Sequence, residues 1–191
     1  MNTFPTPIFG YRKWFIPEGE IDYLRACVFD TPWNKGINIA ECHHDLPCSE
    51  SPGKECHCGF NAWNNWEDNE ESHYDGITGF VAGAGRVEVH PQGFRSSEAQ
   101  ILALFMSKKD YLRCGDKFCS YYGVPVFVNK IKFLKYCENL RNGNCVGLPE
   151  EFSSKEIVMS SVDLQVPVLE MLLGVLLIFL AALVTILLFA L

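Results

Sequence analysis

The last 21 residues of the chain, 171–191, carry no charged side chain, and their only hydroxyl or amide side chain is that of Thr185. An α-helix of this length rises about 31 Å, close to the hydrocarbon thickness of a bilayer. A buried core helix is the alternative, but the rest of the chain is too short to wrap a helix that is apolar on every side. We therefore expect residues 166–191 to form one transmembrane helix.

The orientation of that helix is inferred from the start of the chain. Residues 1–20 contain three prolines and no continuous apolar segment, which is unlike a secretory signal. Ser160 and Ser161, followed by a polar spacer and an apolar tail, also fit a lipid-anchor signal, but that route requires export. We expect a single-pass membrane protein whose N-terminal domain is cytoplasmic.

The charge of the remaining chain limits its partners. Residues 1–165 hold all 16 basic and 22 of the 23 acidic residues, so their formal net charge is −6. Such a chain has no general attraction for nucleic acid phosphates or anionic lipid headgroups, and we expect no nucleic acid partner, although this net charge leaves room for a local basic patch. The nine cysteines are an odd number, and cytoplasmic thiols stay reduced, so a disulfide framework is not expected.

The patterns before the apolar run predict an α+β fold. We expect a globular domain over residues 1–145 with a small antiparallel sheet, then a polar linker over 146–165. The expected strands are short segments rich in aromatic and β-branched residues, at 11–16, 23–29, 77–90 and 94–105. Residues 91–93 (PQG) form a turn between the last two, and the polar residues 64–76 are expected to form a solvated loop.

Two C-terminal helices complete the predicted domain. Ser107, with Asp110 three residues later, resembles a capping box, and Gly123 ends the apolar stripe that follows. Asn129 is placed to cap a second helix that ends near residue 142.

Three glycines lie on one face of the expected strand 77–90, namely Gly79, Gly83 and Gly85. They permit close approach of a ligand or of another part of the chain, and they are equally typical of a bulge or of a packing adjustment.

Cysteines and histidines gather in residues 42–58, in a segment rich in turn-forming residues. Zinc takes about four thiolate or imidazole ligands in tetrahedral geometry. We predict a structural zinc site formed by Cys42, His44, Cys56 and Cys58. The spacing of these residues is irregular for a zinc site. Buried free thiols together with surface histidines are therefore an alternative explanation of the same residues.

The turn between the two long strands carries the candidate catalytic residues His90, Arg95 and Glu98. A histidine beside a carboxylate can transfer protons, and an arginine can bind an oxyanion. A cross-strand network of ion pairs on a solvated face is the alternative.

Six segments of residues 9–127 follow one another in a familiar order: YRKW at 11–14, TPW at 31–33, AEC at 40–42, CHCGFNAW at 56–63, GRVEVHPQGFRSSEA at 85–99 and YGVPV at 122–126. Together they resemble an uncharacterised family of small bacterial, largely actinobacterial, and phage proteins. Ser96 replaces the alanine of the family pattern, and the apolar run 171–191 is an addition to it. The resemblance implies a shared fold and a shared surface around Cys58, His90 and Arg95, and it transfers no reaction.

These observations favour a membrane-tethered intracellular recognition or signalling module that binds an unknown protein or small-molecule ligand. An enzyme that uses His90, Arg95 and Glu98 is the first alternative, and it requires His90, Arg95 and Cys58 to converge on one pocket. A membrane-acting effector is the second, and its toxicity would disappear when residues 166–191 are deleted. Ala181 and Thr185, four residues apart, permit homo-oligomerisation through the transmembrane helix.

Overall fold

The computed structural model describes residues 7–17, 23–28, 31–43, 48–53, 56–72 and 76–143, together with the backbone of residues 154–159. All of these belong to one compact unit, Met1–Met159, and the second unit, Ser160–Leu191, lies outside the described residues. Within the described part, no helix has the length and apolar character needed to cross a bilayer. The expected transmembrane helix at 166–191 falls outside that part.

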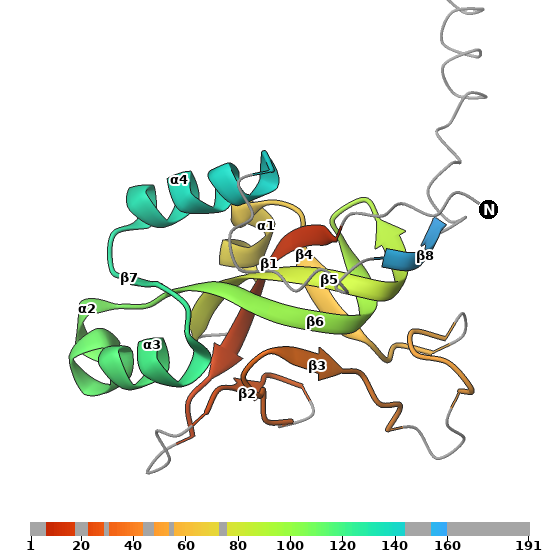
Figure 1. Cartoon of the computed structure of the whole chain (residues 1–191), viewed down its shortest axis with the longest axis horizontal. Helices are drawn as coiled ribbons and strands as arrows, with labels where there is room; N and C mark the ends of the chain where they lie inside the picture. Colours follow the sequence, from red (N-terminus) through yellow and green to blue (C-terminus); the bar gives the residue numbers. More distant parts are fainter. Residues whose placement is uncertain are drawn as a thin grey trace, which may run out of the picture. The chain divides into compact units, whose positions relative to one another are not determined.

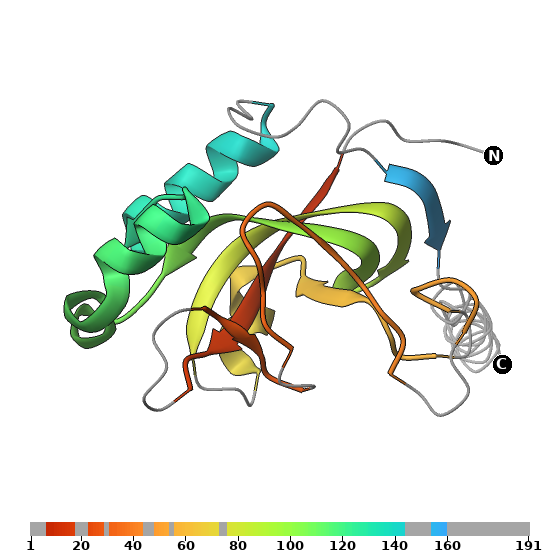
Figure 2. The ribbon, with the colours of Figure 1, turned by 60° about the horizontal axis from the view of Figure 1, so that its bottom comes forward.

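The unit is built on one mixed sheet that is mostly antiparallel, so the α+β class is confirmed (Figure 1). Its central path runs β2-β1-β4-β6-β5-β8, β3 and β7 both pair with β6, and β1 also pairs with β5. The strands are β1 (Ile8–Phe15), β2 (Arg25–Ala26), β3 (Ile37–Ile39), β4 (Phe60–Trp63), β5 (Ile77–His90), β6 (Gly93–Phe105), β7 (Val126–Phe127) and β8 (Ser154–Met159). β1 pairs with β4, β4 pairs with β6, and β6 pairs with β5. Because β5 also pairs with β1, these four strands form a closed ring of pairings. Figure 2 shows the long β5 and β6 curving together, with β1 crossing them.

The hairpin of β5 and β6 matches the predicted strands and turn. The glycines of β5 serve packing: a Cβ on Gly83 would lie 2.3 Å from the Phe94 ring, and Gly85 has a φ of 72° beside an irregularity of the ladder. The first part of β5 is buried on both faces, since every residue from Ile77 to Gly85 is buried. The reason is that β5 has a core on each side: Val81 belongs to one hydrophobic cluster and Phe80 to another.

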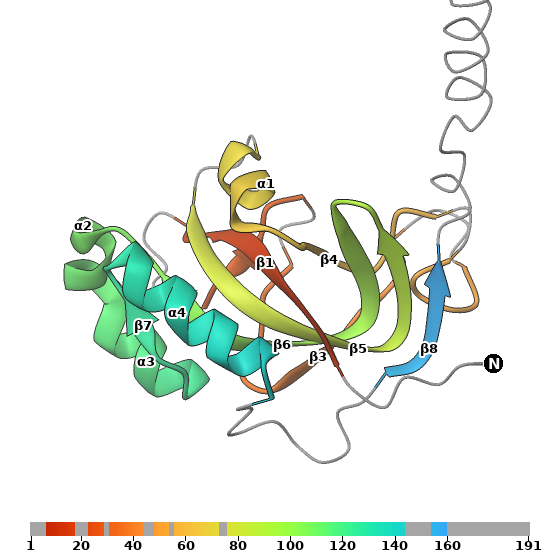
Figure 3. The same ribbon diagram turned by 90° about the horizontal axis from the view of Figure 1, so that it is seen from above.

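Two helical segments cover the two sides of the sheet, as Figures 1 and 3 show. The first is continuous through α2 (Lys108–Asp110), the π-helical η1 (Tyr111–Gly115) and α3 (Asp116–Tyr122). The second is α4 (Lys130–Arg141). Phe118 of α3 packs in the cluster that contains Val81, and Phe133 of α4 packs in the cluster that contains Phe80.

The predicted helix ends are confirmed. The Ser107 hydroxyl accepts a hydrogen bond from the Asp110 N–H, and the Asn129 side chain accepts one from the Lys132 N–H. Gly123 ends α3 in the left-handed conformation, with a φ of 69°. Short polar side chains at the caps and a glycine at the C-terminus are local signals, so they can be read without the tertiary structure.

Three expectations differ from the structure. Part of the loop expected at 64–76 is a helix, α1 (Trp66–Glu71), because Trp66 is buried in an aromatic cluster with Tyr11, Phe105 and Phe133. The strand expected at 23–29 is reduced to the two residues of β2, after which Cys27 and Val28 form a turn. Six residues of the expected linker 146–165 form β8, which pairs in parallel with the edge of β5.

Tyr122 ties α3 to the N-terminal third of the chain. Its buried hydroxyl accepts a hydrogen bond of 2.7 Å from the Leu24 N–H and donates one of 3.0 Å to the Trp33 carbonyl. Replacing Tyr122 by phenylalanine leaves both backbone groups without their partner, so we expect the free energy of unfolding to fall by about 3 kcal/mol. Urea denaturation of the full chain measures this change. Tyr121→Phe is the matched control, because Tyr121 is 39% exposed, and an effect equal to that of Tyr122→Phe would contradict the explanation.

Candidate metal centre

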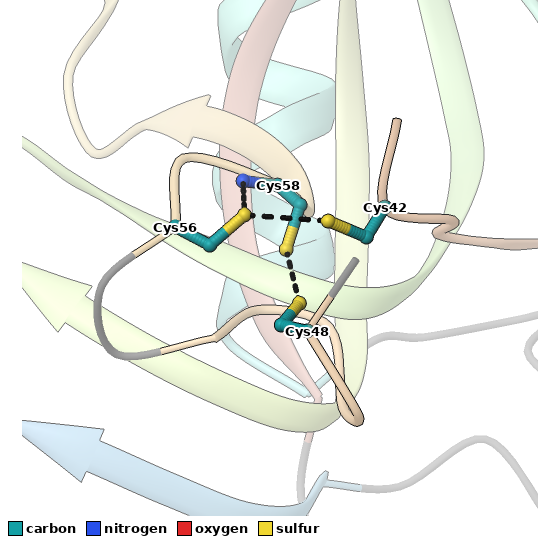
Figure 4. A group of neighbouring side chains, drawn as sticks. All are labelled: Cys42, Cys48, Cys56 and Cys58. Atoms are coloured by element: carbon teal, nitrogen blue, oxygen red, sulfur yellow. Dashed lines mark hydrogen bonds between the residues drawn. The ribbon is translucent and has the colours of Figure 1, made fainter. Parts of the chain in front are cut away.

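Four cysteine side chains converge at one end of the sheet, and Figure 4 shows their sulfur atoms pointing toward one another. We call Cys42, Cys48, Cys56 and Cys58 the cysteine cluster. Their sulfurs all lie within 4.8 Å of one another, with 3.4 Å between Cys42 and Cys56 and 3.3 Å between Cys48 and Cys58. Four sulfurs bound to zinc at 2.3 Å in a tetrahedron are about 3.8 Å apart. The observed separations bracket this value, so the cluster could hold a metal ion.

The cluster forms because two short strands pair with the same part of β6. The Ala40 N–H, just after β3, donates a hydrogen bond of 2.8 Å to the Ser97 carbonyl, and Phe60, at the start of β4, lies opposite Ser96. Cys42 follows the first anchor point by two residues, and Cys58 precedes the second by two. Neighbouring positions on β6 therefore bring together cysteines that are 16 residues apart in the chain.

Backbone N–H groups already point at two of the sulfurs. The Gly53 N–H donates to the Cys58 sulfur and the Cys58 N–H donates to the Cys56 sulfur, each at 3.4 Å. Gly53 can approach this closely because it has no side chain: a Cβ there would lie 2.8 Å from the Cys48 Cβ. Donors of this kind stabilise thiolates and orient metal ligands.

Burial and hydrogen bonds with neighbouring groups shift the pKa values of the thiols in the cluster. The hydrogen bond with Cys58, followed by burial, raises the pKa of Cys48 to about 12. Burial also raises the pKa of Cys56. Burial opposes ionisation of Cys58 too, but the neighbouring Ser51 hydroxyl and the Gly53 N–H outweigh it and lower the pKa of that thiol. The pKa of Cys58 is thus lowered while those of Cys48 and Cys56 are raised, and metal binding requires these thiols to lose their protons.

Arg95 fastens the cluster to the sheet. Its guanidinium donates to the Cys56 carbonyl, to the Cys58 carbonyl at 3.2 Å and to the Glu88 carboxylate. The residue is only 8% exposed, so these bonds are made in a site from which water is largely excluded. Arg95 holds the turn that presents two of the four sulfurs.

Three of the four predicted metal ligands are found close together. Cys42, Cys56 and Cys58 lie together, and Cys48 is the fourth member. The predicted ligand His44 lies outside the described residues. Cys48 was not among the four predicted ligands, although a thiol within the same turn-rich segment was a usable signal.

The candidate catalytic residues take separate places. The carboxylate of Glu88 lies between His90, at 3.9 Å, and Arg95. Glu98 lies further along β6, opposite Ala84. This arrangement is a cross-strand ionic network at the turn end of the hairpin, but Arg95 and Glu88 are largely buried, so it does not lie on the solvated face that the alternative interpretation expected.

Two cavities of similar volume lie in the described part of the chain. One of about 380 Å³ is lined by His90 together with Arg12, Lys13 and Cys27, and one of about 410 Å³ is lined by Cys58 together with Trp33, Ala40, Glu41 and His43. His90 and Cys58 thus line different cavities, and among the described residues Arg95 lines neither. The convergence required for an enzyme that uses all three residues is not found.

We call the 410 Å³ cavity the recognition pocket. We define one wall as residues 37–41 and 43 and the other as residues 58–60, and Trp33 and Arg12 also line the pocket. The guanidinium of Arg12 lies 5.1 Å from the centre of the Trp33 ring, and that ring meets Phe60 edge-on at 4.8 Å. Cys58 lines the second wall, and Cys42 lies between Glu41 and His43 of the first, so the cysteine cluster joins the segments that form the two walls.

Comparisons with protein-family models, with curated proteins and with solved structures gave no match.

Proposed function

We propose that this protein is a membrane-tethered recognition module whose ligand pocket is held in shape by a structural zinc ion. The observation that carries the proposal is the position of the cysteine cluster: Cys58 lines one wall of the recognition pocket, and Cys42 lies between Glu41 and His43 of the other. A metal ion bound by these four sulfurs would fix the distance between the walls.

Zinc fits this set of ligands best. Soft thiolate ligands in a four-sulfur set select zinc or iron–sulfur chemistry over magnesium and calcium. Four protein ligands fill a tetrahedral zinc ion and leave no position for substrate, which is typical of a structural site. Because no coordination position is left for a substrate, the metal ion stabilises the shape of the pocket and takes no part in a reaction. The pocket then binds its ligand without catalysis.

The lining of the recognition pocket supports small-molecule or peptide binding. Trp33 and Phe60 supply aromatic surface, and Arg12, Glu41 and His43 supply charged or polar groups. A mostly apolar cavity with a few polar groups is the usual form of a ligand site. The exposed Ile37 and Ile39 extend apolar surface from the pocket along β3.

The coupling between metal and pocket is testable without knowing the ligand. Removing zinc from the full chain with a chelator is expected to speed amide exchange in residues 37–43 and 56–60, because the link between the two walls is lost. Exchange in α4 is expected to stay unchanged, since its packing depends on the aromatic cluster around Phe133. Hydrogen–deuterium exchange with mass spectrometry, with and without added zinc, measures both. Equal protection of the walls in the two states would refute the proposed role of the metal.

A separate prediction concerns the proposed membrane tether, residues 166–191. Arginines in place of Leu180 and Leu183 are expected to release the full chain from membranes, because each arginine near the centre of a span costs about 3 kcal/mol. The measurement is the fraction of chain that stays in the pellet after extraction with alkaline carbonate. Alanines at the same two positions are the matched control and should leave the chain in the pellet. A wild-type chain that is extracted like the arginine variant would rule out the tether and leave the zinc proposal untouched.

A further inference from the structure

The acidic chain contains one strongly basic part. Residues 107–141, which include α2, η1, α3 and α4, hold eight Lys or Arg and three Asp or Glu residues, a net charge of +5. The rest of the chain carries −12, which together gives the −7 of the whole. We call residues 107–141 the cationic helical end.

The topology brings the starts of its two helices together. β7 pairs in parallel with β6, with Val126 opposite Leu104 and Phe127 opposite Phe105. The Met106 N–H then donates a hydrogen bond of 3.0 Å to the Phe127 carbonyl. The caps Ser107 and Asn129 follow within two residues, so both helices begin side by side, and their N-terminal dipoles add to the positive charge.

Apolar side chains protrude from these helices among lysines. Leu112 is 78% exposed, Ile131 is 77% exposed and Val128, just before α4, is 48% exposed. The lysines are exposed as well and form no ion pair within the described part of the chain: Lys108, Lys109, Lys132 and Lys135. Arginines of the same region are engaged elsewhere, since Arg113 pairs with Asp110 and Arg141 lies over the Tyr11 ring.

We propose that the cationic helical end binds the surface of a membrane that contains anionic lipid headgroups. Lysines attract such a surface, and aliphatic side chains between them gain free energy by entering the boundary with the acyl chains. Nucleic acid offers the lysines similar phosphates but gives Leu112 and Ile131 no apolar phase to enter. The free cations are lysines, whereas base recognition favours the planar fork of arginine.

The test uses the full chain in nanodiscs of phosphatidylcholine, so that residues 166–191 are held away from added vesicles. Co-flotation then compares vesicles of phosphatidylcholine alone with vesicles of phosphatidylcholine and phosphatidylserine at about two to one. We expect binding to the anionic vesicles to be at least about tenfold tighter, and to be lost at about 1 M salt. If residues 166–191 do not insert, the chain enters no nanodisc, and this result shows separately that the tether fails. The chain can then be mixed with the vesicles directly to test the cationic helical end.

Two variants decide between the possible ligands. The double variant Lys132→Glu and Lys135→Glu should weaken vesicle binding at least about 25-fold, at about fivefold per lysine removed, whereas Lys132→Arg and Lys135→Arg should retain it. The variant Leu112→Ser and Ile131→Ser should weaken vesicle binding about tenfold and leave binding to a short DNA duplex unchanged. Equal binding to the two vesicle types would overturn the proposal. It would also be overturned if the serine variant bound vesicles as well as wild type does and the chain bound the duplex more tightly than it binds the vesicles. All substituted side chains are exposed, and an unchanged circular dichroism spectrum confirms that the variants fold.

Discussion

Replacing Cys56 and Cys58 by serine is expected to abolish zinc binding, whereas the wild-type chain is expected to purify with about one zinc ion. Two of the four sulfurs are lost, and they belong to the turn that Arg95 fastens to the sheet. Elemental analysis of the full chain in detergent measures the metal. The midpoint of thermal unfolding should fall by at least about 10 °C, because each kcal/mol lost moves the midpoint of a chain of this size by about 2–4 °C.

The control for this variant is Cys119→Ser. Cys119 is an exposed cysteine of α3 and lies outside the cysteine cluster, so its replacement should leave the zinc content at about one ion per chain. A wild-type chain without zinc, in which mass spectrometry finds Cys42 linked to Cys56 and Cys48 linked to Cys58, would show that the cluster is a pair of disulfides instead. Purification under reducing conditions separates that result from oxidation during preparation.

Arg95→Met should weaken zinc binding about 10–100-fold, which is the usual cost of losing a group that orients metal ligands. It should also lower the free energy of unfolding by about 3–5 kcal/mol, because the variant leaves the Glu88 carboxylate without its buried partner. Competition with a coloured zinc chelator measures the affinity, and urea denaturation of the zinc-loaded chain measures the stability.

Arg86→Met is the matched control for Arg95→Met. Arg86 lies on the neighbouring strand and pairs with Glu50, whose side chain is 66% exposed, so its loss should cost less than about 1 kcal/mol and leave zinc binding unchanged. Arg95→Lys should recover only part of the affinity, since an ammonium group cannot reach two carbonyls and a carboxylate with a planar fork. If Arg95→Met binds zinc as tightly as wild type, Arg95 has no part in holding the cluster.

The elements that could be predicted from sequence are those with local signals. The turn at residues 91–93 fixes the hairpin of β5 and β6, and Ser107, Gly123 and Asn129 fix the ends of the helices. Each signal acts within four residues, so no knowledge of the rest of the chain is needed. The same approach failed for α1, because its sequence is mostly polar. Its helix depends on Trp66, which is buried by aromatic side chains that are distant in the sequence.

The candidate site could be predicted only in outline. Cysteines in a turn-rich segment indicate a metal, but the choice of Cys48 depends on where β3 and β4 meet β6, which is a long-range property of the fold. The Glu88 carboxylate that joins His90 and Arg95 likewise depends on the register of the hairpin after the irregularity at Gly85. Net charge was misleading in the same way: a total of −7 gave no sign of a local +5 at residues 107–141.

The pairing of β3 and β4 with β6 has a consequence for the order of events during synthesis. Cys58 leaves the ribosome 35 residues before Gly93, the first residue of the strand that aligns the cysteines. Until β6 has been made, the pairings that align the two cysteine-bearing segments are missing, so we expect metal capture to be a late step of maturation. Nascent chains stalled before residue 93 should therefore bind zinc weakly, whereas chains stalled after residue 127 and clear of the exit tunnel should bind it as the finished protein does.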